Sequence, residues 1–309
     1  MADERRYVNS IDRILHLRSV RFFAGLGAGE VAAVAEHLIP RSHRAGAVLI
    51  EPGRLVGAGH SIAEGRITLR KGEQTVGHAG PLDAIGMTTM FSEEPADVEA
   101  RTEIDTVTLE IPRDPLLEVF EDQFSILRHV LAAGAGALIE ARRTLPLAGY
   151  QAEPALVVPP PERSLDLVER LLLLRGNAPF RRGSVNALAE MARHQVELRL
   201  PAGAVLWRPG EPADHMLVVI AGAVACRTED GIEFAVGSRQ GLGALDALSG
   251  HRRWYRATVT HDLVALRSNV EGMLDVLEDN VDLAVSLLSA LARDARSIFP
   301  AASPLLLQR

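Results

Sequence analysis

The sequence predicts a mainly β protein made of two copies of one domain, in which short strands are separated by turns and flanked by helices. Three observations predict this class. Residues match at a constant separation of 157, as Gly46 and Gly203 do. Apolar residues between the helices alternate with a period of two, and Gly and Pro turns divide the apolar runs. Many short strands with such turns are typical of sandwiches and barrels.

The repeat runs through both halves without an insertion or deletion, so any site in the protein is potentially two sites. The matching positions are turn residues and small or apolar residues: Gly46, Pro52, Gly53, Gly65, Gly80, Gly86, Ala100, Asp105 and Leu109 recur as Gly203, Pro209, Gly210, Gly222, Gly237, Gly243, Ala257, Asp262 and Leu266.

Each copy begins and ends with a helix. The opening helices carry apolar residues at i, i+3, i+4 and i+7: Val31, Val34, Ala35 and Leu38 in one copy, and Val185, Leu188, Ala189 and Ala192 in the other. Ser184 precedes the second helix as a candidate N-cap. The closing helices carry broad apolar stripes: Leu127, Val130 and Leu131, and Leu283, Leu287, Leu288 and Leu291. The second stripe suits either an intramolecular core or a dimer interface.

Prolines between the copies cannot continue a helix and favour an extended spacer, most clearly in the run Pro159-Pro160-Pro161. We therefore expect a first domain at residues 1–145, a Pro-rich linker at 146–164, a second domain at 165–300 and a tail at 301–309.

Composition limits the function classes. The chain has 40 acidic and 33 basic residues and a formal charge of -7, which disfavours nonspecific attraction to DNA or anionic lipid. The single cysteine, Cys226, cannot form an internal disulfide, so a reducing cytoplasm is the simplest location. No stretch approaches the roughly 20 apolar residues of a membrane span, and the charged amino terminus is unlike a signal peptide.

Several short strings carry a resemblance to a known family. The order of elements, together with Ala45-Gly46-Ala47-Val48-Leu49-Ile50-Glu51-Pro52-Gly53, Glu64-Gly65-Arg66-Ile67 and their clearer counterparts from Pro201 to Asp214 and from Ile220 to Gly222, resembles the cyclic nucleotide-binding domain family. The resemblance covers nearly all of both halves. It implies two tandem β-rolls, each a jelly-roll-like barrel with helices at its ends, related to kinase regulatory subunits and to regulators of the catabolite-activator type.

The resemblance also implies a phosphate-binding cassette, in which Gly-Glu begins a short helix and Pro-Arg follows. Backbone N-H groups and the arginine bind the cyclic phosphate, and the glutamate accepts a hydrogen bond from the ribose. In the first copy the cassette falls on Gly86, Met87, Thr88, Pro95 and Ala96, so methionine replaces the glutamate and alanine replaces the arginine. Asp97 and Glu99 add negative charge there. We expect this pocket to be inactive toward cyclic nucleotides, with Met87 and Met90 filling the core.

The second cassette keeps arginines but lacks the glutamate. Its candidate ligand-binding residues are Gly243, Ala244, Leu245, Arg253, Arg256, Ala257 and Thr258, with Ala244 at the glutamate position. Counting back from the threonine places the arginine position at Tyr255. Three interpretations of residues 252–256 stay open: an exposed, solvated loop, an anion or nucleotide site in which Trp254 or Tyr255 stacks on a base, and a protein contact.

No catalytic motif stands out: the sequence has no phosphate loop, no nucleophile elbow and no pair of histidines at metal-ligand spacing. A helix-turn-helix would need some 70 residues after the roll, so we expect no DNA binding.

The sequence therefore predicts a non-enzymatic, cytoplasmic regulatory or scaffold protein that acts through protein contacts, with an unidentified protein partner, a homo-oligomer as one option and no cofactor. The alternative is a sensor whose second domain binds cAMP, cGMP or another anionic small molecule. A third interpretation, a regulatory subunit that inhibits a kinase, lacks a basic inhibitory segment before the first roll.

Overall fold

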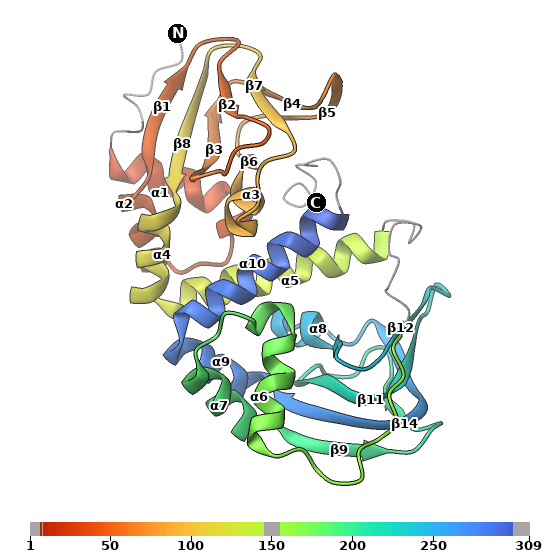
Figure 1. Ribbon diagram of the computed structural model, residues 1–309. Coiled ribbons are helices and arrows are strands. Elements are labelled where there is room, and N and C mark those ends of the chain that lie inside the picture. Colours follow the sequence, from red (N-terminus) through yellow and green to blue (C-terminus); the bar gives the residue numbers. More distant parts are fainter. Residues whose placement is uncertain (1–6, 8, 145–154, 299–309) are drawn as a thin grey trace. The chain divides into compact units, whose positions relative to one another are not determined.

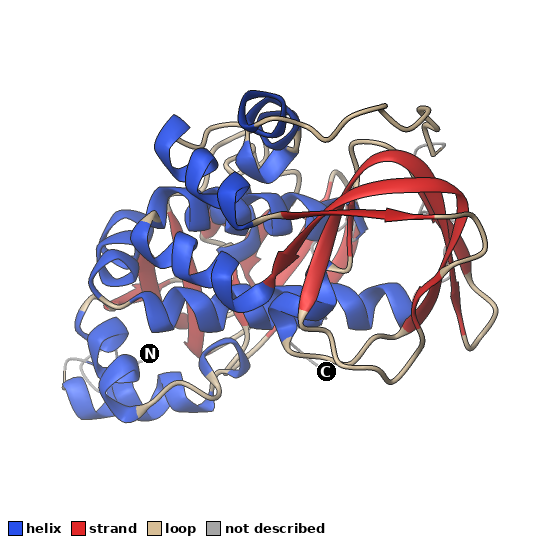
Figure 2. Cartoon of the chain, turned by 90° about the horizontal axis from the view of Figure 1, so that it is seen from below, coloured by secondary structure: helices blue, strands red, loops and turns tan. Residues whose placement is uncertain are grey.

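The computed structural model describes residue 7, residues 9–144 and residues 155–298 (Figure 1). The chain divides into two compact units, Met1–Ala133 together with Leu288–Arg309, and Gly134–Leu287. Figure 2 distinguishes the helices and strands, and both units contain both kinds of element.

In the first unit, helices flank a series of eight strands. The helices are α1 (Ser10–Ser19), a short 3₁₀ turn η2 (Arg21–Phe23), α2 (Ala28–Glu36), α3 (Met87–Ser92), α4 (Arg113–Asp122), the first part of α5 (Phe124–Thr144) and the end of α10 (Val281–Ile298). The strands are β1 (Ile39–His43), β2 (Val48–Ile50), β3 (Ala58–Glu64), β4 (Ile67–Lys71), β5 (Gln74–Ala79), β6 (Ala84–Ile85), β7 (Glu99–Thr102) and β8 (Thr106–Pro112).

These strands form two antiparallel sheets of four strands, in the orders β1-β8-β3-β6 and β2-β7-β4-β5. In β1 and β8, Ile39 lies opposite Glu110 and His43 opposite Thr106. A buried apolar cluster that includes Ile62, Ile67 and Ala100 forms the core. The predicted class, mainly β with flanking helices, is confirmed, although the sheets are open and do not close into a barrel.

The second unit repeats this arrangement with longer strands. Its helices are the rest of α5, α6 (Leu167–Gly176), a 3₁₀ turn η4 (Ala178–Phe180), α7 (Val185–His194), α8 (Ala244–Ser249), α9 (Val270–Asp279) and the start of α10. Its strands are β9 (Val196–Leu200), β10 (Val205–Trp207), β11 (His215–Thr228), β12 (Glu233–Val236), β13 (Gly241–Leu242) and β14 (Tyr255–Asn269). They form one antiparallel sheet along β10-β14-β11-β12, with β13 paired to β11 and β9 paired to β14.

The structure reproduces the repeat element by element. Four pairs of elements have both ends 157 residues apart: β1 and β9, β2 and β10, α3 and α8, and α4 and α9. For example, β1 begins at Ile39 and β9 begins at Val196. Ser184 caps α7 as predicted, because its side chain accepts a hydrogen bond of 3.1 Å from the backbone N-H of Ala187. The two copies therefore share one fold at the level of single turns.

A left-handed glycine bends each roll at the same point. Gly65, with φ +101°, lies between β3 and β4, and so joins the two sheets of the first unit. Its counterpart Gly222, with φ +86°, lies inside the unbroken strand β11. A Cβ atom would overlap Thr106 at Gly65 and the carbonyl oxygen of Asp262 at Gly222. Both the backbone angle and the available space thus require glycine.

Each closing helix is divided between the two units. Helix α5 closes the first copy, yet its residues from Gly134 onward belong to the second unit. Helix α10 closes the second copy, yet its residues from Leu288 onward belong to the first unit. Each unit therefore combines one roll with the end of the other copy's closing helix. The predicted stripe of α10, which includes Leu283, Leu287 and Leu291, is buried within the chain, which favours the intramolecular role.

Part of the expected linker packs on the second roll. The carbonyl of Leu156 accepts a hydrogen bond of 2.7 Å from Ser238, and that of Val158 accepts one of 3.0 Å from Gly222. Residues 155–161 have no helix or strand of their own, in keeping with an extended segment. Residues 145–154 of the linker and the expected tail at 301–309 lie outside the described residues.

Helix α5 corrects one expectation. Among the described residues, its segment Phe124–Arg143 is long and apolar enough to cross a membrane, by length and composition alone. Half of this segment is buried inside the structure, and the core helix of a soluble protein passes the same test. The statement that no stretch approaches the length of a span is therefore wrong for this helix.

Two buried histidines distinguish the first unit from the second. His16 lies 2.8 Å from the hydroxyl of Ser61, and His60 lies 3.4 Å from that of Thr108. Burial lowers the pKa of both histidines from 6.5 to about 4. The four positions that lie 157 residues later are apolar: Leu173, Val218, Leu217 and Ala265.

We expect the fold to lose stability in acid through these histidines. The pKa values of both histidines are lower in the folded chain than in the unfolded chain, so the folded chain binds fewer protons between pH 6.5 and 4. The free energy of unfolding therefore decreases as the pH is lowered through that window. For each histidine, the free energy of unfolding at neutral pH exceeds that below pH 4 by on the order of 3 kcal/mol. The variant His16→Leu, Ser61→Val, His60→Leu, Thr108→Ala, which copies the second roll, is expected to have a flatter pH dependence in denaturant unfolding. An unchanged dependence would contradict this account.

Gly222→Ala is expected to destabilise the chain more than Gly231→Ala. Both glycines have positive φ, but an added Cβ meets nothing within 4 Å at Gly231, whereas it overlaps the backbone at Gly222. The extra cost is about 1 to 3 kcal/mol, the usual range for overpacking. Urea unfolding midpoints of the two variants measure the difference, and equal midpoints would show that the bend at Gly222 tolerates a side chain.

Candidate functional site

Two short helices begin after left-handed glycines at equivalent places. Gly86, with φ 80°, precedes α3, and Gly243, with φ 77°, precedes α8. These are the turns that the sequence places at the start of each cassette. At Gly243 a side chain is also excluded by space, because a Cβ would overlap a guanidinium nitrogen of Arg253 and lie 3.0 Å from Trp207.

Backbone hydrogen bonds fix the arginine position of the second cassette. The N-H of Gly53 donates to the carbonyl of Ala96 at 2.7 Å, and the N-H of Gly210 donates to the carbonyl of Arg253 at 2.8 Å. Arg253 therefore occupies the same place in its loop as Ala96. This corrects the count from the threonine, which pointed to Tyr255.

The guanidinium of Arg253 is directed into the unit. The residue is 1% exposed, and its Nη1 donates to the carbonyl of Gly243 at 3.1 Å and lies 3.3 Å from a carboxylate oxygen of Asp246. Nη2 donates to the carbonyl of His215. The Cζ atom lies 3.9 Å from the centre of the Trp207 ring, in a cation-π contact. The positive charge is thus neutralised and solvated from within the chain.

Asp246 is the counterion of this arginine. It is 1% exposed and lies in α8 among apolar neighbours, Ala247 and Leu248. Burial raises the pKa of its carboxyl group above the ordinary value, and the nearby guanidinium of Arg253 opposes that shift. Two charges of opposite sign are therefore held together where water does not reach them.

Aromatic rings pack around the pair. The Trp207 and Tyr255 rings are 5.8 Å apart with an edge-on arrangement, and Trp254 stacks on Phe234 at 6.1 Å. Tyr255 is 4% exposed and Trp207 is 2% exposed. The Trp rings and Tyr255 thus form the wall of the arginine site and belong to the core of the unit. The interpretation of residues 252–256 as an exposed, solvated loop is therefore wrong for Arg253 and Tyr255.

The structure separates the other predicted residues of this cassette. Arg256 is exposed and Ala257 is buried on strand β14, because neighbouring strand residues face opposite sides. Thr258 lies opposite Ala225 of β11. Ala244 and Leu245 are half-buried at the start of α8. Arg253 and Gly243 are in contact, whereas Arg256 lies on the exposed side of the strand.

The first cassette is filled by a methionine. Met87 is 2% exposed, and its sulfur atom occupies the space that a Cβ on Gly59 would take. Met90 is 1% exposed, so the predicted core role of both methionines is confirmed. Ala96 is buried, Thr88 is half-buried, and Pro95 is exposed in the turn that follows α3. No guanidinium from this loop itself faces the Gly86 turn.

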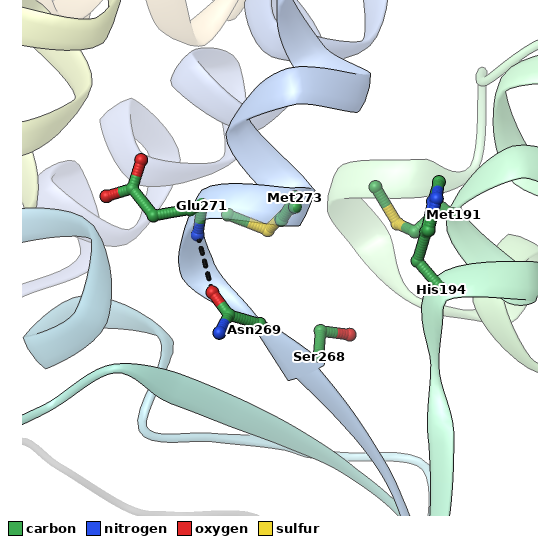
Figure 3. A pocket seen from close by; sticks show the side chains of 7 residues that line it. Met191, His194, Ser268, Asn269, Glu271 and Met273 are labelled. Carbon is green, nitrogen blue, oxygen red and sulfur yellow. Dashed lines mark hydrogen bonds between the residues drawn. The ribbon is translucent and has the colours of Figure 1, made fainter.

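A separate pocket lies between α7 and the junction of β14 with α9 (Figure 3). Its volume is about 300 Å³, and its lining consists of Met191, His194, Ser268, Asn269, Glu271, Gly272 and Met273. The Asn269 side chain accepts a hydrogen bond of 2.9 Å from the N-H of Glu271 and so caps α9. The pocket shares no lining residue with the cassette. Within the described part of the chain, no group of three or more His, Cys, Asp or Glu side chains is placed to hold a metal ion.

Sequence reasoning missed Asp246, Trp207 and the carbonyl of His215. Asp246 had a signal, because it is the one charged residue in the apolar run from Leu242 to Leu248. The repeat held a second signal, since Ala96 and Arg253 are 157 residues apart.

A comparison against protein-family models matches one family at two places in the chain. The model for the cyclic nucleotide-binding domain matches residues 40–123 and residues 197–280, which together make up more than half of the chain. A comparison with curated proteins found no match.

Solved structures give weaker similarities. The regulatory subunit of a cAMP-independent protein kinase A from Trypanosoma brucei is 16% identical, with 91% of this chain and 92% of that chain covered and a TM-score of 0.35. The regulatory domain of Toxoplasma gondii protein kinase A, crystallised with cAMP, is 16% identical over 91% of this chain and 98% of that chain, with a TM-score of 0.35. The amino-terminal domain of a transcriptional regulator from Streptomyces coelicolor is 29% identical over 42% of this chain and 97% of that chain, with a TM-score of 0.38. At these TM-scores the similarities support no argument about function.

The buried pair predicts strong coupling between Asp246 and Arg253. Removing either charge leaves the other buried without its counterion, so we expect Asp246→Leu and Arg253→Met each to cost about 3 to 5 kcal/mol. The double variant is expected to cost much less than the sum, because no unpaired charge remains.

Denaturant unfolding of the two single variants and the double variant measures this coupling. The exposed pair Arg227 and Glu233, whose charged atoms are 3.5 Å apart, serves as the control and is expected to couple by less than about 1 kcal/mol. Additive effects at Asp246 and Arg253 would contradict the assignment of Asp246 as the counterion.

Proposed function

The chain belongs to the cyclic nucleotide-binding domain family in two copies, and from this premise we propose that it is a non-enzymatic regulatory protein that acts through protein contacts. In this proposal neither cassette holds a cyclic nucleotide in the ordinary way. The observation that carries it is the buried pair of Arg253 and Asp246.

The arginine of the second cassette already has its anion. A cyclic phosphate would have to replace Asp246 as the partner of Arg253, and this would leave a buried carboxylate without its counterion. Breaking a buried ion pair in this way costs about 3 to 5 kcal/mol. Binding would therefore lose much of the free energy that the arginine supplies elsewhere in the family.

The ribose contact is also absent in both copies. Ala244 and Met87 follow the cassette glycines, and neither side chain can accept a hydrogen bond from a sugar hydroxyl. A charge-assisted hydrogen bond is worth about 1.5 to 3 kcal/mol. The residues present thus do not fit a cyclic nucleotide bound through the usual arginine and glutamate.

The first cassette has the wrong charge for a phosphate. Ala96 stands in the arginine position, and Glu94 and Asp97 on either side of it are acidic. The nearby cations are already paired with these carboxylates, Arg296 with Glu94 and Asp97, and Lys71 with Asp97. In this proposal the first roll has the fold of a ligand-binding domain, but its cassette loop lacks the side chains that bind a phosphate.

Exposed apolar side chains support a role in protein contacts. On α1, Ile11 and Leu15 are 61% and 57% exposed, and on α6 their counterparts Val168 and Leu172 are 63% and 66% exposed. Each pair is one helical turn apart, so each forms a small apolar face at the same place in its copy. An exposed apolar face thus occurs at the same place in both copies, and such a face suits a contact with a protein partner.

The proposal places the protein in a reducing, cytoplasmic setting. Cys226 is the single cysteine of the sequence and is buried in β11. Burial raises the pKa of its thiol far above the ordinary value, which makes the thiol unreactive.

A second function has one specific observation in its favour. The Nε of Arg253 and the Nε1 of Trp207 are buried and have no hydrogen-bond partner among the described residues. Unpaired buried donors beside a cassette turn are expected where a small anionic ligand completes the site. In this alternative the second roll is a sensor built on Gly243 and Arg253, and Arg256 takes no part because it lies on the exposed side of β14.

Calorimetric titration of the intact protein with cAMP, cGMP and cyclic dinucleotides distinguishes the two functions. We expect no binding up to millimolar ligand, since the arginine is neutralised internally. Micromolar binding by the intact protein would overturn the proposal, and loss of that binding in Arg253→Ala but not in Arg252→Ala, with both variants folded by circular dichroism, would establish the sensor. Arg252 is the matched control because its side chain is exposed and its guanidinium donates to a backbone carbonyl, that of Gly210.

A further inference from the structure

The loop that follows α3 in the first cassette receives an arginine from the far end of the chain. Arg296, in the last turn of α10, has a side chain that is only 17% exposed. Its Nη1 donates to the hydroxyl of Ser92 at 2.8 Å and to the carbonyl of Glu94 at 3.2 Å. Its Nη2 donates to the carbonyl of Pro95 at 2.8 Å and lies 3.5 Å from a carboxylate oxygen of Asp97.

Two further contacts complete this set of acceptors. The carboxylate of Glu94 lies 3.5 Å from Nη1 of Arg296. Arg293, one turn earlier on α10, donates to the carbonyl of Ser92 at 3.3 Å. A planar guanidinium with several fixed donors matches such an arrangement of carbonyl, hydroxyl and carboxylate oxygens better than an ammonium group does.

The shape of the loop explains why these oxygens converge. Glu93 adopts a left-handed conformation, with φ 57°, and ends α3. Ser92 is fully buried, and its hydroxyl donates to the carbonyl of Thr89 at 2.8 Å, which leaves its lone pairs for Arg296 and the N-H of Glu94. The turn therefore presents consecutive acceptors to one side.

The repeat shows that this site is a property of the first copy alone. The residues that lie 157 positions after Glu94, Pro95 and Asp97 are His251, Arg252 and Trp254, so the second loop has no carboxylate there. The residues that lie 157 positions before Arg293 and Arg296 are Gly136 and Ile139. An acidic loop and the arginines that bind it thus occur together, and the copy without one lacks the other.

We propose that the loop Ser92–Asp97 is an arginine-binding site and that Arg296 fills it in cis, as a latch that holds the end of α10 on the first unit. The loop occupies the position of a phosphate-binding cassette, but its carboxylates and carbonyls select a cation instead of an anion. The latch also keeps Leu291, Ala292 and Ala295 of α10 buried. Its release exposes an apolar helix face, which a regulatory protein could offer to a partner.

Amide hydrogen exchange in the full chain tests the latch. Arg296→Ala is expected to speed exchange in residues 288–298 by about tenfold or more, because the charge-assisted bonds that hold the helix end are lost. Glu94→Gln with Asp97→Asn is expected to act in the same direction to a smaller extent, since the carbonyl acceptors remain. High salt is expected to speed exchange there in the wild type and to have less effect in Arg296→Ala.

Arg143→Ala is the matched control, because Arg143 is an exposed arginine in the last turn of α5 and its removal changes the net charge equally. Exchange in β8 of the first unit and in β11 of the second reports whether each variant keeps its fold. The proposal is overturned if exchange in residues 288–298 is unchanged by Arg296→Ala, or if Arg143→Ala speeds it as much. Neither result depends on whether the rolls bind a nucleotide.

Discussion

A positive charge that water cannot reach sets the arrangement of the second cassette. An arginine cannot lose its proton at any accessible pH, so the chain must supply oxygen atoms and a counter-charge wherever the guanidinium is buried. Around Arg253 it supplies two carbonyls and Asp246, and it adds the face of Trp207. The buried guanidinium also restricts the residue at position 243 to glycine, because a Cβ atom there would overlap it.

A second constraint, which is steric, explains why the two copies differ in their cassettes but not in their folds. The bends at Gly65 and Gly222 are set by steric exclusion against the neighbouring strand, which any copy of the roll must satisfy. The cassette side chains are not needed for that bend. Met87 can therefore fill the first pocket with apolar volume while Arg253 and Asp246 fill the second with a paired charge.

Fold and site differ in how far the sequence predicts them. Strand periodicity, the repeat and the cap at Ser184 are local signals, and they predicted the elements correctly. The division of α5 and α10 between the units depends on tertiary packing, because an apolar stripe does not indicate which roll it packs against. The cassette position of Arg253 was also hidden, because counting back from Thr258 points to Tyr255. Asp246 lies in an apolar run, where a lone carboxylate predicts a partner without naming it.

Each cassette loop binds a guanidinium through both carbonyl and carboxylate oxygens, but the two arginines, Arg253 and Arg296, come from different parts of the chain. In the second copy the side chain at the loop position itself, Arg253, turns inward onto Asp246. In the first copy that position is Ala96. The acidic loop around it binds Arg296, which lies on a helix about 200 residues further along the chain. An alanine at this position removes the internal charge, and the surrounding carboxylates then favour a cation from outside over the phosphate that such a loop binds elsewhere. With alanine at this position and acidic residues beside it, the loop of the first copy thus forms a contact between distant segments of the same chain.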